Sequence, residues 1–147
     1  MRRKEGFSLV ELLIVLAVMA ALIATITPVA LNAIRKAKAT QVAQNLKTIA
    51  SSFENAVYVD GEAPTSLSSL ARDIDTSNYG LGYTVSSGTY TVVVFTKEEV
   101  TLSQVTAVLA DAANSATVTP STFLTGGLGS DDFGSGQVFY EFSFVAY

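Results

Sequence analysis

The chain has 147 residues, of which 49% are hydrophobic, and its 9 basic and 13 acidic side chains give a formal net charge of −4. This length allows one globular domain, and the hydrophobic fraction is high for a freely soluble one. Histidine and cysteine are both absent from the sequence, which excludes disulfides, thiol nucleophiles and the commonest zinc ligands. The acidic balance also argues against nonspecific nucleic-acid binding by the bulk of the domain.

The N-terminal region combines a basic start with a long apolar run. Three basic residues occupy positions 2–4, and an apolar segment begins at Phe7. Between Glu11 and Arg35 the sequence has no ionisable side chain, a pattern typical of a membrane segment. As a helix, residues 7–27 would extend about 32 Å, enough to cross a bilayer once.

Pro28 divides the predicted N-terminal helix into two halves. Proline lacks a backbone donor, so we expect the helix to kink or melt locally at the end of a transmembrane half, residues 7–28. Residues 29–56 continue as an amphipathic half, since apolar residues recur there mostly at three- and four-residue steps. These are Leu31, Ile34, Val42, Leu46, Ile49 and Phe53. This apolar stripe needs a partner, which the C-terminal part of the chain supplies.

Residues 57–147 are predicted to form a globular head. Turn residues indicate loops at 58–64 and 125–136, the second with five glycines, and short helices are expected at about 66–74 and 103–113. Alternating residues on both sides of Ser87-Gly88 predict a β-hairpin. A strand at 118–124 would lie at a sheet edge because it contains a proline, and 137–147 has the strongest strand pattern.

These elements predict an α+β fold. The long N-terminal helix, transmembrane in its first half and amphipathic in its second, would pack on a small antiparallel sheet of three or four strands. The apolar face of the sheet would then cover the amphipathic half of the helix.

The segment at residues 6–14, Gly-Phe-Ser-Leu-Val-Glu-Leu-Leu-Ile, resembles the type IV pilin signature. Its features are a basic leader, a small residue, an aromatic residue and a carboxylate five positions into an uncharged span. The close resemblance covers about residues 1–34. The architecture expected for the rest is similar to the type IV pilin fold.

The resemblance implies that residues 1–6 are a leader peptide. A prepilin peptidase would cut after Gly6 on the cytoplasmic side and methylate the new amine of Phe7. The basic residues at 2–4 agree with this orientation through the positive-inside bias. Glu5 stands where the family usually has lysine, which would slow cleavage without removing the site.

Glu11 is the most informative residue of the motif. A lone carboxylate in a membrane helix costs on the order of 2.5–3.5 kcal/mol and needs a partner. The resemblance implies that this partner is the Phe7 amine, in a filament that of a neighbouring subunit. The alternative is that Glu11 lies shallow in the membrane and reaches the headgroups without a further role.

The implied function is that of a structural subunit of a type IV pilus. The subunit would wait in the cytoplasmic membrane as a single-pass protein until the pilus assembly machinery adds it to an extracellular helical homopolymer. Such filaments serve adhesion, twitching motility or DNA uptake. Alternatives are a major pseudopilin of a type II secretion system, a monomeric membrane-anchored binding module that uses residues 125–136, a permanent anchor, and a signal peptide cleaved near residues 37–39.

Other candidate sites give weaker signals. Asp131 and Asp132 are candidate Ca²⁺ ligands, but their spacing matches no recognised calcium loop, so we expect a turn and no cofactor. The aromatic C-terminal tail is interpreted as core rather than as an electron-carrying stack. Acidic neighbours such as Glu98 and Glu99 are not spaced as a catalytic pair, so no enzymatic activity is expected.

A basic strip is predicted on the amphipathic half of the helix. Its members are Arg35, Lys36, Lys38 and Lys47. We interpret the strip as a solvated helix face. Contacts with acidic neighbours in a filament, or with DNA during uptake, are the alternative and leave nucleic-acid binding open.

Overall fold

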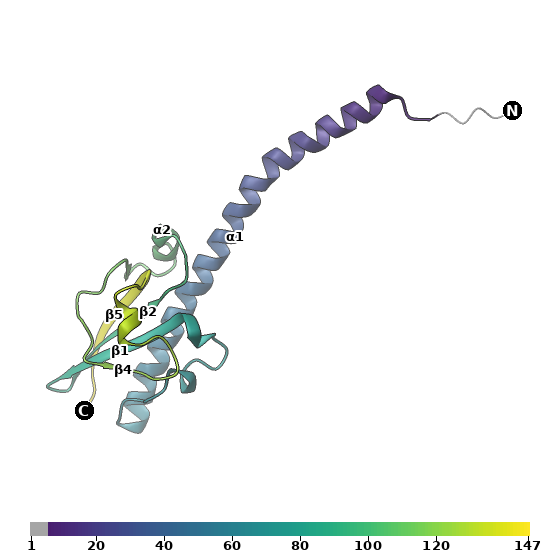
Figure 1. The fold of residues 1–147 in the computed structure, drawn as a ribbon. Helices are drawn as coiled ribbons and strands as arrows, with labels where there is room; N and C mark the ends of the chain where they lie inside the picture. The colour runs from purple at the N-terminus through teal and green to yellow at the C-terminus, as the bar shows by residue number, and fades with distance from the viewer. Residues whose placement is uncertain (1–5) are drawn as a thin grey trace. The chain divides into compact units, whose positions relative to one another are not determined.

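The computed structural model describes residues 6–147 and divides at position 35 into two compact units (Figure 1). The predicted leader therefore lies outside the described residues except for Gly6. The elements, in chain order, are α1 (Leu9–Asp60), η1 (Leu67–Ser69), η2 (Thr76–Asn78), β1 (Tyr79–Ser86), β2 (Thr89–Thr96), α2 (Leu102–Thr106), β3 (Ala112–Ala113), β4 (Thr122–Phe123), α3 (Ser130–Phe133) and β5 (Val138–Val145).

In the first unit, α1 is a helix whose apolar side chains are all exposed. It is long and apolar enough by composition to cross a membrane. Exposure extends past the predicted transmembrane half: Leu31 and Ile34 are 48% and 64% exposed. The prediction that these two residues belong to the covered stripe is wrong, because burial along α1 begins only at Ala39.

The helix is continuous through Pro28, so the prediction of local melting is wrong. Proline removes only one helical hydrogen bond, and the turns on either side keep theirs. Two hydroxyls just before it also bond within the helix: Thr25 donates to the Leu22 carbonyl at 2.9 Å and Thr27 to the Ile23 carbonyl at 2.7 Å. Hydroxyls bonded in this way need no other partner in an apolar medium. A kink at Pro28 stays a prediction.

The second unit contains an antiparallel sheet with the strand order β3-β5-β2-β1-β4. The predicted hairpin is confirmed: β1 and β2 pair from Tyr79↔Thr96 to Ser86↔Thr89. Its turn has positive φ at both central residues, 50° at Ser87 and 80° at Gly88, the turn geometry that matches the twist of paired strands. The sheet has five strands rather than three or four, because two-residue strands β3 and β4 form its edges.

The main core lies between the sheet and the part of α1 that begins at Ala39. The helix contributes fully buried residues at three- and four-residue steps: Val42, Leu46, Ile49, Phe53 and Val57. The sheet contributes the alternating residues of β5 that face this helix, with the ring of Phe144 6.3 Å from that of Phe53. The α+β fold of a long helix packed on an antiparallel sheet is therefore confirmed.

A second, smaller cluster covers the opposite face of the sheet. Val93, Phe95 and Phe139 are buried there beneath Phe123 and Phe133 from the connection between β3 and β5. This face was not assigned a partner from the sequence. The glycine-rich connection covers it in addition to linking two strands.

Several predicted boundaries are corrected. The helix expected to end near residue 56 continues to Asp60, and the helix expected at 66–74 reduces to the short 3₁₀ helix η1. The helix expected at 103–113 ends at Thr106, since Ala112 and Ala113 pair with β5. The strand expected at 118–124 is limited to β4, and the loop at 125–136 contains α3. For the helix expected at 103–113, pairing with β5 rather than local propensity sets the boundary.

Candidate processing and assembly site

The predicted cleavage site lies just before α1. Gly6 and Phe7 are outside regular structure and exposed, with 85% of Phe7 accessible. A Cβ added to Gly6 would meet no other atom within 4 Å, so the fold itself does not require glycine there. If a small residue is required at this position, the requirement comes from a processing enzyme rather than from the fold.

Ser8 and Glu11 form a reciprocal capping box at the start of α1. The Glu11 backbone N–H donates to Ser8 Oγ at 3.2 Å, and the Ser8 backbone N–H donates to Glu11 Oε2 at 3.2 Å. Together these bonds satisfy two of the amide donors that a helix start leaves unpaired. Ser8 was not singled out from the sequence, although Ser-x-x-Glu before an apolar run is the recognisable signal for such a cap.

The capping box gives Glu11 a partner within its own chain. Its carboxylate lies in the first turn of α1, where the helix dipole favours negative charge. One of its oxygens already accepts a hydrogen bond from Ser8. Ser8 is therefore a source of stabilisation for Glu11 that was not expected from the sequence. The pairing of Glu11 with a Phe7 amine stays a prediction.

Residues 1–27 match the family model described as the prokaryotic N-terminal methylation motif. The chain carries a class III prepilin-type signal. This signal agrees with the predicted resemblance and is consistent with a type IV pilin or a pseudopilin. No curated protein and no solved structure matched the chain.

The prepilin-type signal overlaps the exposed apolar part of α1. The signal ends at residue 27, inside the stretch of α1 that is apolar enough to cross a membrane. A prepilin-type signal of this kind marks processing by a prepilin peptidase, and together with the helix it fits a membrane-anchored subunit.

The second candidate site, Asp131-Asp132, lies in α3. The Asp132 carboxylate pairs with the Lys97 ammonium and accepts a hydrogen bond from the Gly129 N–H at 3.2 Å. These contacts lower the pKa of Asp132, with the Lys97 hydrogen bond as the largest cause. Lys97 supplies the positive charge that a cation would otherwise supply. Among residues 6–147, no group of three or more acidic side chains is placed to hold a metal.

The predicted basic strip is partly engaged within the head. Lys38 forms an ion pair with Glu98 at 3.2 Å, and Lys47 Nζ donates to the Tyr140 hydroxyl at 2.8 Å. The hydrogen bond to Tyr140 is the main cause that raises the pKa of Lys47. Lys47 is therefore bonded within its own chain while its side chain stays exposed, so the interpretation of the strip as a solvated helix face stays a prediction.

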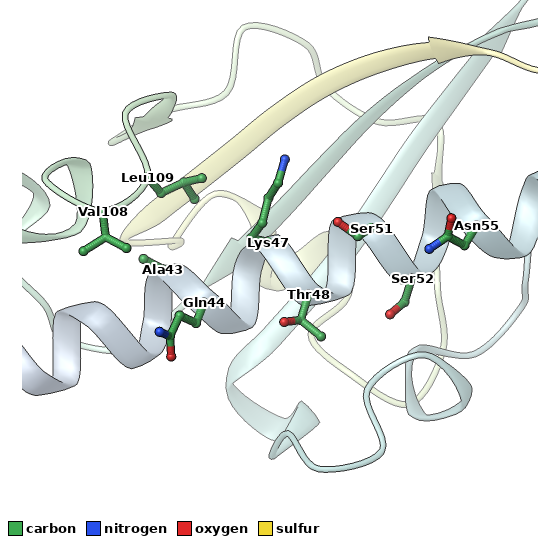
Figure 2. A pocket seen from close by; sticks show the side chains of 9 residues that line it. All are labelled: Ala43, Gln44, Lys47, Thr48, Ser51, Ser52, Asn55, Val108 and Leu109. Atoms are coloured by element: carbon green, nitrogen blue, oxygen red, sulfur yellow. The ribbon is translucent and has the colours of Figure 1, made fainter.

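A shallow groove of about 520 Å³ lies along the exposed side of α1 in the head (Figure 2). The residues of α1 that line it run from Ala43 to Asn55 and are uncharged except for Lys47, and Val108 and Leu109 form one wall. Lys47 extends away from Gln44 and Thr48 in this view. The groove therefore offers amide and hydroxyl groups together with the ammonium of Lys47.

Proposed function

We propose that this protein is a structural subunit of a type IV pilus. The observation that carries the proposal is the prepilin-type signal at residues 1–27, which leads into a helix whose apolar side chains are all exposed as far as residue 38. An exposed apolar helix of this length is stable only in a membrane or against other helices. A subunit that moves from a bilayer into a filament uses the same surface for both.

The proposed maturation begins with cleavage after Gly6 and methylation of the Phe7 amine. The exposed, irregular backbone at both residues is accessible to a peptidase. Mature subunits would stay in the cytoplasmic membrane through residues 7–28 until the assembly machinery extracts them. The extracellular filament would then contain residues 7–56 in its core and the head, residues 57–147, at its surface.

Glu11 is proposed to guide each incoming subunit into register. It is the only acidic residue between Gly6 and Arg35, and burial in the filament core favours an oppositely charged partner. The amine of Phe7 on a neighbouring subunit supplies such a charge after cleavage. On this proposal, the amine joins or replaces the Ser8 N–H at the carboxylate.

Mass spectrometry of the N-terminus tests the processing step. Protein from the native host should begin with N-methylated Phe7. Retention of Met1 in protein that still polymerises would overturn the proposal. Electron microscopy of material sheared from the cells tests the filament: long surface fibres are expected, whereas fibres confined to the periplasm would indicate a pseudopilin, and protein that forms no polymer would indicate a monomeric anchor.

Glu11→Ala tests the role in register. This variant should insert into the membrane normally, since it removes a charge from an apolar helix, and should lose most or all filaments. Glu11→Gln is the matched control for capping, because its amide oxygen still accepts from Ser8 while the charge is gone. Normal filament yield from Glu11→Gln would refute the pairing, whatever the yield from Glu11→Ala.

A further inference from the structure

The first part of the connection between β3 and β5, residues 114–120, is held to the sheet by one side chain. Glu141 on β5 accepts from the Thr117 N–H at 2.8 Å, from Thr117 Oγ1 at 2.5 Å and from the Val118 N–H at 3.3 Å. Within the described part of the chain, every hydrogen bond made by residues 114–120 ends on this carboxylate.

Few apolar contacts support the same segment. Four of its seven residues are exposed, and only Ala116 and Val118 are half-buried before the buried Pro120. Pro120 packs closely on Gly82, where an added Cβ would come within 2.6 Å of the proline ring. The segment is thus fixed at its far end by Pro120 and at its near end by β3.

The remainder of the connection is attached by backbone hydrogen bonds. Leu124 donates to the Leu81 carbonyl at 3.0 Å, and Leu128 donates to the Tyr79 carbonyl at 2.8 Å. Both acceptors belong to β1, a central strand of the head. These residues are therefore expected to open only when the sheet itself unfolds.

A groove of about 460 Å³ lies between residues 114–120 and the sheet. Ser115, Thr117 and Val118 line one side, and Phe139, Glu141 and Phe142 of β5 line the other. Movement of the segment away from β5 would widen this groove and expose Phe139, which lies on this face of the sheet.

We propose that residues 114–120 form a flap, latched by the Glu141 carboxylate, that opens over this groove while the rest of the head stays folded. The proposal does not depend on the filament function. It depends on the Glu141 carboxylate, which makes the hydrogen bonds that hold this segment. On either side, the segment is bounded by β3 and by the packed Pro120.

Amide hydrogen exchange of the full-length protein in detergent micelles, followed by NMR, tests the flap. In the unmodified protein, Thr117 and Val118 should exchange faster than Leu124 and Leu128. Glu141→Gln keeps the shape of the side chain but turns one acceptor into a donor. It should raise the exchange rates of Thr117 and Val118 about tenfold or more, with Leu124 and Leu128 unchanged.

Two further variants keep the test decisive. Glu98→Gln is the same substitution at an acidic residue that pairs with Lys38 instead, and it should leave the flap amides unchanged. Thr117→Val removes only the hydroxyl donor and should raise Val118 exchange by a smaller factor, which tests the latch even if Glu141→Gln does not fold. The proposal would be overturned if the exchange rates of Thr117 and Val118 were unchanged in both Glu141→Gln and Thr117→Val. It would also be overturned if Leu124 and Leu128 were accelerated as much as the flap amides.

Discussion

Lys47, on the helix, donates through Nζ to the hydroxyl of Tyr140 on β5, 2.8 Å away, and the ammonium lies 5.1 Å from the centre of the same ring. The contact joins α1 to the strand that follows the glycine-rich connection, 93 residues later in the chain. It places the Lys47 ammonium at the margin of the core, where it donates to the phenol hydroxyl.

Tyr140→Phe should lower the free energy of unfolding of the head by about 0.5–1.5 kcal/mol, because it removes the hydrogen-bond acceptor and keeps the ring. Urea unfolding monitored by circular dichroism would measure the change. Since the pKa of Lys47 is raised in the folded state, the contribution is present below the ordinary lysine value of 10.5 and is lost as pH rises through the folded value. Tyr58→Phe, which removes a hydroxyl that donates to the Val145 carbonyl instead, should leave this alkaline dependence in place.

Ser8→Ala should fray the first turn of α1. The substitution removes the acceptor for the Glu11 N–H and typically costs about 1 kcal/mol at such a position. Hydrogen exchange of the Glu11 and Leu12 amides in micelles would report the change, and Ser8→Thr should restore protection because it keeps a hydroxyl. Equal protection in the alanine and serine proteins would show that the capping box contributes nothing.

Leu46→Ala and Leu16→Ala separate the two functions of α1. Leu46 is fully buried in the core of the head, so its truncation should cost about 2–5 kcal/mol of unfolding free energy. Leu16 is 61% exposed, and the identical substitution there should leave unfolding of the head unchanged. Thermal unfolding of both variants in the same detergent measures this, and a large effect from Leu16 would contradict the assignment of that segment to a membrane or a filament core.

Asp132→Asn should reduce the acid sensitivity of the head. The pKa of Asp132 is lowered in the folded state, so its contribution is present above the ordinary value of 3.8 and is lost as pH falls through the lower folded value. The aspartate protein should therefore lose stability across this acidic range more steeply than the asparagine variant. Unfolding midpoints measured from neutral to acidic pH give the two slopes, and parallel slopes would exclude the Lys97 pair as the cause.

The parts of the fold that depend on regular periodicity were predictable. The long helix, the hairpin at Ser87-Gly88 and the final strand each repeat a simple pattern over many residues, and all three are confirmed. Strands β3 and β4 are two residues long, too short for any periodicity to register. They exist because the backbone of β5 and of β1 offers a partner at those positions.

In the candidate site, too, local patterns were predictable from the sequence and long-range contacts were not. Gly6, Phe7 and Glu11 were identified from their types and spacing, whereas the contribution of Ser8 was missed although its signal is local. The pairing of Lys97 with Asp132 joins residues 35 positions apart, and that of Glu141 with Thr117 spans 24 positions. Contacts over such separations follow from sheet topology, which local sequence patterns do not specify.

The two short edge strands have a consequence for crowding. Many copies of a head displayed side by side along a fibre would meet at very high local concentration, where long open strand edges invite uncontrolled sheet growth. Here β3 offers Ala112 and Ala113, and β4 offers Thr122 and Phe123, a template too brief to recruit another strand. In the proposed filament, β3 and β4 would therefore add little to contacts between heads, and association would depend on the helix.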